Sequence, residues 1–306
     1  MRIWVKKSHI LTGFEKENSN LTQIPSIQPC HLVGPWSWAF SVSAPARWKS
    51  TPSPRSTPSL LCLSSVYQLF ENAAKKYDEM NDSMTLGIHR IWRDILLCHM
   101  NPYPGAQLID VAGGTGDIAF RFLNYVRSQR EHQIQQKLRS HQNLSWQEIT
   151  HLYQEEENGS LGGSHVVVCD INKEMVKVGK QKSQQLGYSE GLSWVVGNAE
   201  DLPFQDDKFD IYTIAFGIRN VTHMDQVLQE AYRVLKPGGR FLCLEFSQVN
   251  NSLLSRLKTY QYLVESIRRF PAQEEFKEMI EDAGFVKVEY QNLTLGIVAI
   301  HSGFKL

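Results

Sequence analysis

Residues 108–117 read LIDVAGGTGD, in which a short, mostly apolar run is followed by three glycines within four residues. An apolar run of this length is typical of a buried strand in a parallel sheet. The glycines allow the chain to turn sharply and to approach a ligand closely, and residues 117–125 have the spacing of a helix. The first amide groups of such a helix have no partner within it and carry partial positive charge. The stretch therefore predicts a strand, a ligand-binding loop and a helix.

Strand and helix patterns alternate along the rest of the chain. We expect strands at residues 108–112, 166–169, 192–196, 209–216, 240–246, 285–293 and 296–304. We expect further helices at residues 173–186, 223–235 and 273–283, with Asn172 as the N-cap of the first of these. Alternation is typical of a doubly wound α/β sheet, and the short link before the last strand requires antiparallel pairing there. The predicted fold is a seven-stranded, mostly parallel sheet that binds ligands beyond the carboxyl ends of its strands.

Two regions fall outside this pattern. Residues 1–70 hold seven Lys or Arg against two Glu, and seven of the twelve prolines, in a chain whose net charge is zero. A basic, acid-poor, Ser-rich start is typical of an organelle transit peptide. We therefore interpret residues 1–65 as a mitochondrial transit region and residues 66–306 as the folded domain. Residues 127–164 are rich in Gln, His and charged residues, and we expect a partly helical surface insertion there.

The composition argues against several classes of function. With 32 Lys+Arg and 32 Asp+Glu, the chain lacks the basic excess typical of a protein that binds nucleic acid. The five cysteines form no CxxC pair, so we predict no structural metal site. No apolar run reaches the roughly 18 residues that a membrane span needs.

The glycine loop is compatible with two types of cofactor. Residues 114–119 match the G-x-G-x-x-[GA] pattern of dinucleotide sites, which leaves an NAD-dependent oxidoreductase open. However, Asp110 and Asp117 flank the loop, and two carboxylates repel a pyrophosphate. They favour a ligand that carries an ammonium or sulfonium group.

Polar residues also follow the next two predicted strands. Asp170 ends the second strand, where a carboxylate is able to accept hydrogen bonds from both hydroxyls of a ribose. Asn198 and Ala199 follow the third strand, where an amide side chain and a backbone N–H are able to recognise an adenine edge. Because these strand ends meet at one edge of the sheet, the positions together predict a nucleoside cofactor.

Taken together, the motifs resemble a known family. The chain resembles class I S-adenosylmethionine-dependent methyltransferases in the glycine loop, in Asp170, and in residues 198–202 and 235–239 (LKPGG). The resemblance narrows to the ubiquinone/menaquinone C-methyltransferases in residues 70–82 (FENAAKKYDEMND), 216–221 (FGIRNV) and 268–271 (RRFP). It covers residues 66–306. It implies a Rossmann-like methyltransferase fold, S-adenosyl-L-methionine as the cofactor, and C-methylation of a polyprenyl benzoquinol in ubiquinone biosynthesis.

The resemblance also implies roles for individual residues. Contacts to the methionine part of the cofactor are expected from Gly113, Gly114, Thr115 and Gly116. Asp170 would bind the ribose, and Asn198 and Ala199 would flank the adenine. Arg219 and Asn220 follow the fourth strand, where we expect Arg219 to stabilise a developing phenolate and Asn220 to orient it. Tyr77 and Met80 are expected in the lid of the acceptor pocket.

The family further implies a cellular place and partners. The implied place is the matrix side of the mitochondrial inner membrane, with peripheral membrane contact. The implied partners are a multi-subunit ubiquinone-synthesis complex and a second copy of the chain in a homodimer. One segment departs from the family pattern: after residues 244–247 (LEFS) the family has a further aromatic-rich helical segment that covers the acceptor pocket and contributes to subunit contacts. Here residues 255–258 run almost directly into the next family motif, which begins at Tyr260. The departure keeps a second interpretation open, in which the chain is a non-catalytic, methyltransferase-like scaffold subunit.

Overall fold

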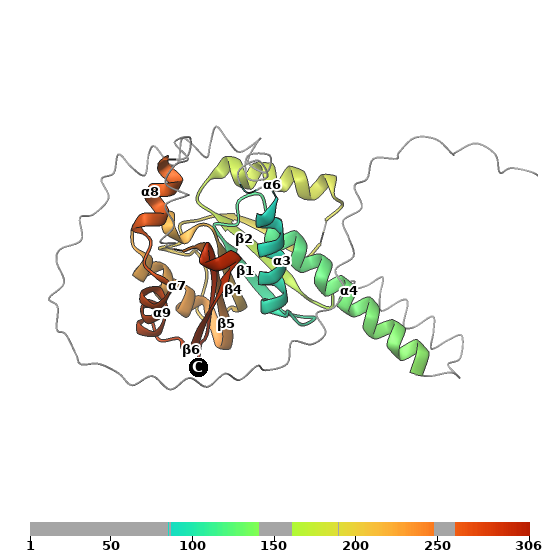
Figure 1. Ribbon diagram of the computed structural model, residues 1–306. Coiled ribbons are helices and arrows are strands. Elements are labelled where there is room, and N and C mark those ends of the chain that lie inside the picture. Colours follow the sequence, from blue (N-terminus) through green and yellow to red (C-terminus); the bar gives the residue numbers. More distant parts are fainter. Residues whose placement is uncertain (1–84, 86, 141–160, 189, 248–260) are drawn as a thin grey trace, which may run out of the picture. The chain divides into compact units, whose positions relative to one another are not determined.

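The computed structural model describes residues 85, 87–140, 161–188, 190–247 and 261–306 (Figure 1). All of them belong to one unit, Pro35–Leu306. The predicted transit region, the middle of the predicted insertion, and the two predicted lid residues Tyr77 and Met80 lie outside the described residues.

Seven strands form one sheet in the order β3-β2-β1-β4-β5-β7-β6. Their bounds are β1 Gln107–Val111, β2 His165–Asp170, β3 Leu192–Val196, β4 Phe209–Ala215, β5 Leu235–Phe246, β6 Val286–Leu293 and β7 Val298–Phe304. Strand β7 pairs antiparallel with both β5 and β6, so it alone among these strands runs against the others, as predicted. The chain leaves β1 toward β2 and β3 and later returns to β4 on its other side. The strand order therefore reverses at β1 and β4, where ligands of such sheets bind.

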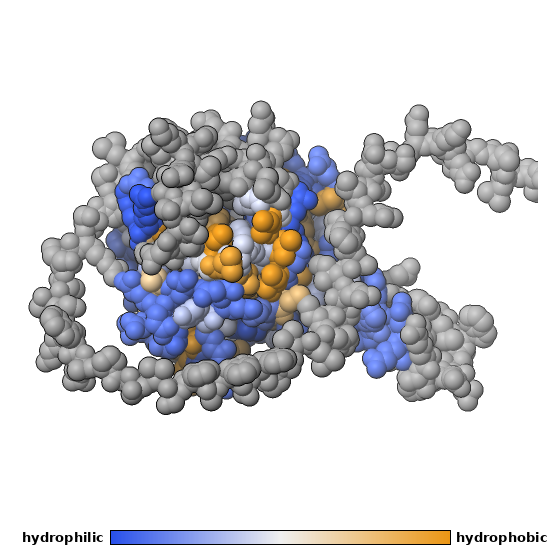
Figure 2. Space-filling view, viewed as in Figure 1, coloured by the Kyte–Doolittle hydropathy of each residue, from blue (hydrophilic) through white to orange (hydrophobic). Residues whose placement is uncertain are grey.

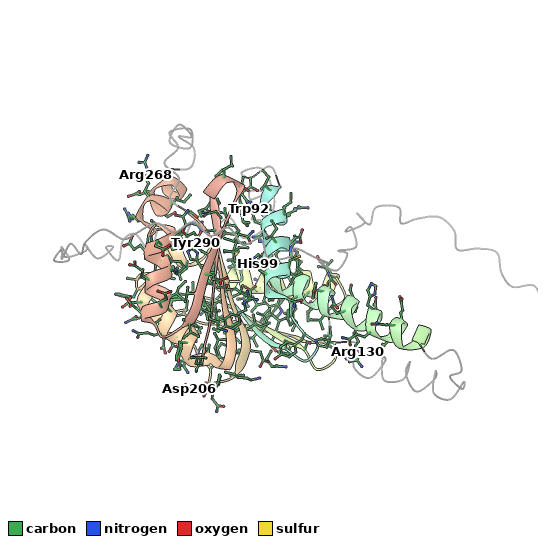
Figure 3. The ribbon with its side chains drawn as sticks, turned by 60° about the horizontal axis from the view of Figure 1, so that its bottom comes forward. Trp92, His99, Arg130, Asp206, Arg268 and Tyr290 are labelled. Atoms are coloured by element: carbon green, nitrogen blue, oxygen red, sulfur yellow. The ribbon has the colours of Figure 1, made fainter. Side chains whose placement is uncertain are left out.

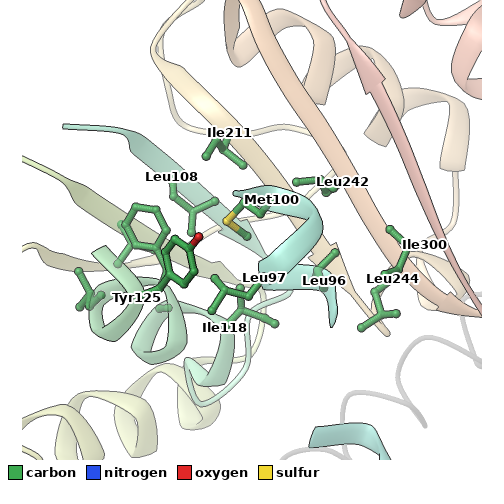
Figure 4. Close-up of a cluster of buried hydrophobic side chains, with 14 of the residues drawn as sticks. Leu96, Leu97, Met100, Leu108, Ile118, Tyr125, Ile211, Leu242, Leu244 and Ile300 are labelled. Carbon is green, nitrogen blue, oxygen red and sulfur yellow. The ribbon is translucent and has the colours of Figure 1, made fainter. Parts of the chain in front are cut away.

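Helices cover both faces of the sheet. Their bounds are α3 Ile88–Met100, α4 Asp117–Ser140, α6 Lys173–Gln185, α7 Met224–Val234, α8 Gln261–Arg269 and α9 Gln273–Asp282. Two 3₁₀ turns, η2 Ile218–Asn220 and η5 Thr294–Gly296, follow β4 and β6. On one face Leu96 of α3 and Ile118 of α4 pack with Leu108 of β1 (Figure 4). On the other face Val227 of α7 and Phe276 of α9 belong to a second buried cluster. Among the described residues, no helix is long and apolar enough to cross a membrane.

The start of α6 confirms the local reasoning from sequence. Asn172 has extended backbone angles, and its side-chain oxygen accepts hydrogen bonds from the N–H groups of Glu174 and Met175 at 2.9 and 3.3 Å. This is the geometry of an N-cap residue. The cap fixes the chain directly after β2, and thereby fixes the position of Asp170.

Helix α4 is longer than predicted. It continues beyond residue 125 to Ser140, and no side chain between residues 127 and 136 is buried. The apolar stripe that marks a core-facing helix ends at Val126, so the sequence pattern stopped where the core contact stops. The first part of the predicted insertion is therefore an exposed continuation of α4, the part on which Figure 3 labels Arg130.

Strand β5 begins earlier than predicted, at Leu235 rather than at residue 240. Gly238 donates its N–H to the carbonyl of Lys305, and Lys305 donates to the carbonyl of Gly239. Helix α7 ends at Val234, directly before the LKPGG run as predicted, but its C-cap is the extended Leu235 and the two glycines lie within β5, where they pair with Lys305. Between Leu235 and Arg240 the register with β4 shifts, which marks a bulge.

Candidate functional site

A cavity of about 410 Å³ lies at the carboxyl ends of β1 to β4. In Figure 3, Arg268 of α8 marks this end of the molecule, because α8 contacts η2, and Asp206, just before β4, marks the opposite end. The volume of the cavity lies within the range of small-molecule sites. The predicted site residues that line it are Gly114, Asp170, Asn198, Ala199 and Asn220. The predicted residues Gly113, Thr115, Gly116 and Arg219 are not among the described residues of its wall.

The glycine loop packs closely against its surroundings. Gly114 and Gly116 have φ values of +57° and +85°, which lie in the left-handed region that side chains disfavour. A Cβ atom at Gly116 would lie 2.6 Å from the ring of Trp194, a residue of β3. Thr115 between them is buried. Gly114 thus faces the cavity, while Gly116 lets β3 approach the loop.

Asp170 ties the end of β2 to the glycine loop. Its Oδ2 atom accepts the N–H of Gly114 at 2.9 Å, and Oδ1 accepts the N–H of Asn172 at 2.8 Å. Burial raises the pKa of Asp170, and these two hydrogen bonds oppose that rise. A carboxylate oxygen has further lone pairs, so the side chain is still able to accept hydrogen bonds from a ligand in the cavity.

The two aspartates that flank the loop have different environments. Asp110 is fully buried; its Oδ1 accepts the hydroxyl of Thr213 at 2.9 Å, and its Oδ2 has no partner among the described residues. Burial raises the pKa of Asp110 to about 7. Asp117 instead pairs with Arg93 at 3.3 Å and Arg121 at 3.1 Å. Burial raises the pKa of Asp117, but the two guanidinium groups outweigh it and the net pKa is lowered. The charge of Asp117 is therefore already compensated by its own partners, whereas Asp110 has no such partner in the part of the chain that the structure describes.

The loop after β3 is held by its own asparagine. The Oδ1 atom of Asn198 accepts the N–H of Glu200 at 3.1 Å, and the carbonyl of Asn198 accepts the N–H of Asp201 at 3.1 Å. This is the turn role that Asn commonly plays. Asn198 and Ala199 remain in the cavity wall, beside Glu200.

Arg219 lies in a buried ion pair rather than on the surface. Its Nη1 atom donates to Glu245 Oε1 at 2.6 Å and to the carbonyl of Phe216 at 2.7 Å. The side chains of Arg219 and Glu245 are 8% and 1% exposed, and Arg219 Nε is buried without a partner among the described residues. Burial raises the pKa of Glu245, and Arg219 counteracts it. Asn220, the next residue, faces the cavity, as does Phe216, whose φ is +59°.

Sequence reasoning missed two acidic residues of this region. Glu245 is the single charged residue in the apolar end of β5, LCLEF, and that isolation was a signal for a buried partner. Glu200 follows Ala199 in a loop rich in acids, where nothing in the sequence distinguishes it. In the structure Glu200 lines the cavity and binds the segment around His223.

Comparison with known proteins assigns the chain to a family. The model of the ubiE/COQ5 methyltransferase family matches residues 61–257 and 252–305. The chain belongs to this family. It is therefore an S-adenosylmethionine-dependent methyltransferase of the predicted seven-stranded class, and the NAD-dependent oxidoreductase that the glycine pattern left open is not supported.

Curated members of the family are closely similar. The mitochondrial 2-methoxy-6-polyprenyl-1,4-benzoquinol methylase of Gallus gallus is 72% identical over 261 residues, which cover 79% of this chain and 84% of the relative. The proteins of the same name from Homo sapiens and Danio rerio are 70% and 61% identical, each with 79% of this chain and 80% of the relative covered.

Solved structures support the fold alone. The cyclase SpnF has a TM-score of 0.50 and 15% identity, covering 70% of this chain and 80% of that chain. A chain of the complex that contains the Haloferax volcanii Trm112 methyltransferase activator has a TM-score of 0.51 and 17% identity, covering 77% and 96%.

The comparisons are consistent with the departure from the family pattern. The family model matches in two pieces that meet at residues 252–257. The alignment with the Gallus gallus protein extends over 261 positions and takes up 79% of the 306 residues here, or about 242, so about 19 of its positions are gaps in this chain. This agrees with the departure from the family pattern noted after residues 244–247.

Proposed function

We propose that this chain transfers the methyl group of S-adenosylmethionine to a ring carbon of a 2-methoxy-6-polyprenyl-1,4-benzoquinol, in mitochondrial ubiquinone synthesis. The observation that carries the proposal is the cavity itself. One wall holds Asp170, Asn198 and Ala199, the predicted cofactor side, and another holds Phe216 and Asn220, the predicted acceptor side. The substrate is taken from the names of the similar animal methylases.

The residues of the cavity fit S-adenosylmethionine. Asp170 would accept the ribose hydroxyls, and Asn198 and Ala199 would flank the adenine. The methionine part would lie along the loop of Gly113, Gly114, Thr115 and Gly116, of which Gly114 lines the cavity. Asp110 Oδ2, a buried acceptor with no partner among the described residues, lies beside Gly113 and outside the wall. When bound, S-adenosylmethionine supplies a methyl group on a positively charged sulfur.

The acceptor needs a negative charge on its hydroxyl oxygen to make the neighbouring ring carbon nucleophilic. Arg219 is permanently charged and therefore unsuited to take the proton itself. A water molecule would relay the hydroxyl proton to solvent, and would also carry away the hydrogen of the methylated ring carbon as the ring regains aromaticity and the hydroxyl its proton. We assign to Arg219 the electrostatic stabilisation of the phenolate. Asn220, which faces the cavity, would contact the acceptor and orient it. Glu245 would keep the guanidinium fixed in its buried position, next along the chain to Asn220 of the cavity wall.

Two further site residues are proposed from the family motif. Tyr77 and Met80 would form part of the lid over the acceptor. Replacing each by Ala should raise the KM for the benzoquinol and leave S-adenosylmethionine affinity unchanged. A loss of cofactor affinity instead would place them outside the acceptor pocket.

Peripheral membrane contact on the matrix side of the inner membrane is part of the proposal, with residues 1–65 as the transit region. Apolar side chains gather on the face beside α3 and η5 (Figure 2), where Ile88, Ile91 and Leu295 are 38%, 58% and 101% exposed. Trp92 of α3 donates its indole N–H to Thr294 of η5 at 2.7 Å, which holds these two elements together. Ile91→Ser with Leu295→Ser should abolish co-flotation with anionic vesicles. Unchanged flotation would remove this face from the proposal.

A homodimer and a multi-subunit ubiquinone-synthesis complex complete the proposal. Light scattering of the purified chain tests the first, and co-purification from mitochondria tests the second. A monomer at all accessible concentrations would contradict the homodimer.

The central test is methyl transfer to a short-tail benzoquinol analogue. It is measured with this chain and with a variant in which the segment that the family carries is inserted after Ser255. Transfer by either form, lost in Asn220→Ala, supports the proposal. The lacking segment also favours the scaffold interpretation, in which both forms bind S-adenosylmethionine and neither transfers a methyl group.

A further inference from the structure

Glu200 joins the two sides of the cavity. It lies on the loop between β3 and β4, and its carboxylate accepts three hydrogen bonds from the segment before α7. Oε1 accepts the N–H of Thr222 at 2.7 Å and that of His223 at 3.1 Å, and Oε2 contacts His223 Nδ1 at 3.0 Å. Glu200 and Thr222 both line the cavity.

The location favours a carboxylate. His223 is the N-cap residue of α7 but makes no side-chain cap bond, so Glu200 supplies an acceptor just before the positive end of this 11-residue helix. The Glu200 side chain is 15% exposed. Burial raises its pKa, but the hydrogen bonds from His223 and Thr222 outweigh this and lower the pKa overall. Glu200 is therefore held ionised in a fixed orientation.

A second tie joins the same loop to α7 away from the cavity. Glu230 accepts the N–H of Leu202 at 2.7 Å, and Arg233 donates to Glu230 at 2.7 Å and to the carbonyl of Leu202 at 3.0 Å. None of these three residues is among the described residues of the cavity wall. The bonds of Glu230 hold the loop to α7 at a place away from the cavity. Removing the bonds of Glu200 should therefore displace only the part of the loop that lines the cavity.

We propose that Glu200 is a positioning residue that sets the spacing between the cofactor side and the acceptor side of the cavity. Its own loop carries Asn198 and Ala199, and the segment that it holds carries Asn220 and Val221. The inference rests on the proposed function, because the spacing matters where two ligands must meet. Misplacing reactants by about 1 Å is able to cost about a hundredfold in rate.

The experiment compares Glu200→Ala, Glu200→Gln and the neighbouring exposed control Asp201→Asn. In Glu200→Ala we expect kcat for methyl transfer to fall about tenfold to a hundredfold, with a several-fold weaker S-adenosylmethionine affinity. Glu200→Gln should recover most of the loss, because its amide oxygen is able to accept from Thr222 and His223. His223→Ala removes a single bond of the three and should cost little.

Thermal unfolding is measured beside the kinetics, and rates are taken well below each Tm. Unchanged kcat and affinity in folded Glu200→Ala overturn the proposal, and so does a Glu200→Gln variant as impaired as Glu200→Ala. If both the wild-type chain and the variant with the added segment bind S-adenosylmethionine but neither transfers a methyl group, the proposed function fails. The calorimetric affinities of the Glu200 variants then decide the positioning role separately, since a displaced loop must still weaken cofactor binding.

Discussion

Replacing Glu245 by Ala leaves Arg219 buried without its counter-charge. Glu245 is 1% exposed and accepts hydrogen bonds from Arg219 Nη1 at 2.6 Å, from Arg219 N at 3.4 Å and from Phe246 N at 2.8 Å. Removing one member of such a buried pair costs about 3–5 kcal/mol. For a domain of this size each kcal/mol shifts Tm by about 2–4 °C, so we expect Tm to fall by about 6–20 °C.

A double variant separates the stability of this pair from its chemistry. Replacing both charges by apolar groups of similar size is often neutral or stabilising. Arg219→Met with Glu245→Leu should therefore recover most of the lost Tm in a calorimetric scan. The double variant should bind S-adenosylmethionine but transfer no methyl group, because it lacks Arg219. A Tm within about 1 °C of wild type in Glu245→Ala would refute the buried pair. Transfer at the wild-type rate by the double variant would refute the catalytic role of Arg219.

Three further changes test the site and its support. Asp170→Ala should weaken S-adenosylmethionine binding about tenfold to a hundredfold by calorimetry, because it loses charged hydrogen bonds to the ribose, whereas the exposed control Asp282→Ala should not. Burial raises the pKa of Asp110 from 3.8 to about 7, so the folded state retains a proton that the unfolded state releases. The free energy of unfolding should therefore fall by up to about 4 kcal/mol as pH rises from about 4 to about 7, and denaturant unfolding of Asp110→Asn should lack this decline. Gly179→Ala would place a Cβ 2.3 Å from the ring of Trp194 and should lower the free energy of unfolding by about 1–3 kcal/mol. Adding Trp194→Phe should restore stability, and a double variant as unstable as Gly179→Ala would contradict the contact.

The sequence predicted the parts of the fold that local physics decides. Strand β3 was predicted to the residue, and the cap at Asn172 followed from its side chain and position alone. The placement of β7 between β5 and β6 was not predicted, because antiparallel pairing is implied by a short link but spatial order is not. Similarly, the early start of β5 depends on Lys305 at the far end of the chain.

In the candidate site, too, the features set by local sequence were predicted and those set by distant partners were not. Asp170, Asn198 and Ala199 line one cavity, as expected, because residues at successive strand ends must meet at one edge of the sheet. The environments of Arg219 and Asp117 were not predicted, because each depends on a partner distant in sequence. The partner of Arg219 is Glu245, and that of Asp117 is Arg93. A charged residue in a motif does not reveal whether its charge faces a ligand or another side chain.

The position of the lacking segment predicts that it affects catalysis rather than cofactor binding. Every described residue of the cavity wall precedes residue 223, and so lies well before the interruption at 252–257. The end of β5 is held on its far side by β7, through Phe246 opposite Val298 and a hydrogen bond from Ser247 N to the carbonyl of Ile297. Glu245 lies there, so the shortened connection begins within a few residues of the group that orients Arg219. Restoring the segment should therefore leave the S-adenosylmethionine Kd unchanged and raise only the turnover. A change in Kd of comparable size would show that the segment acts through the cofactor side instead.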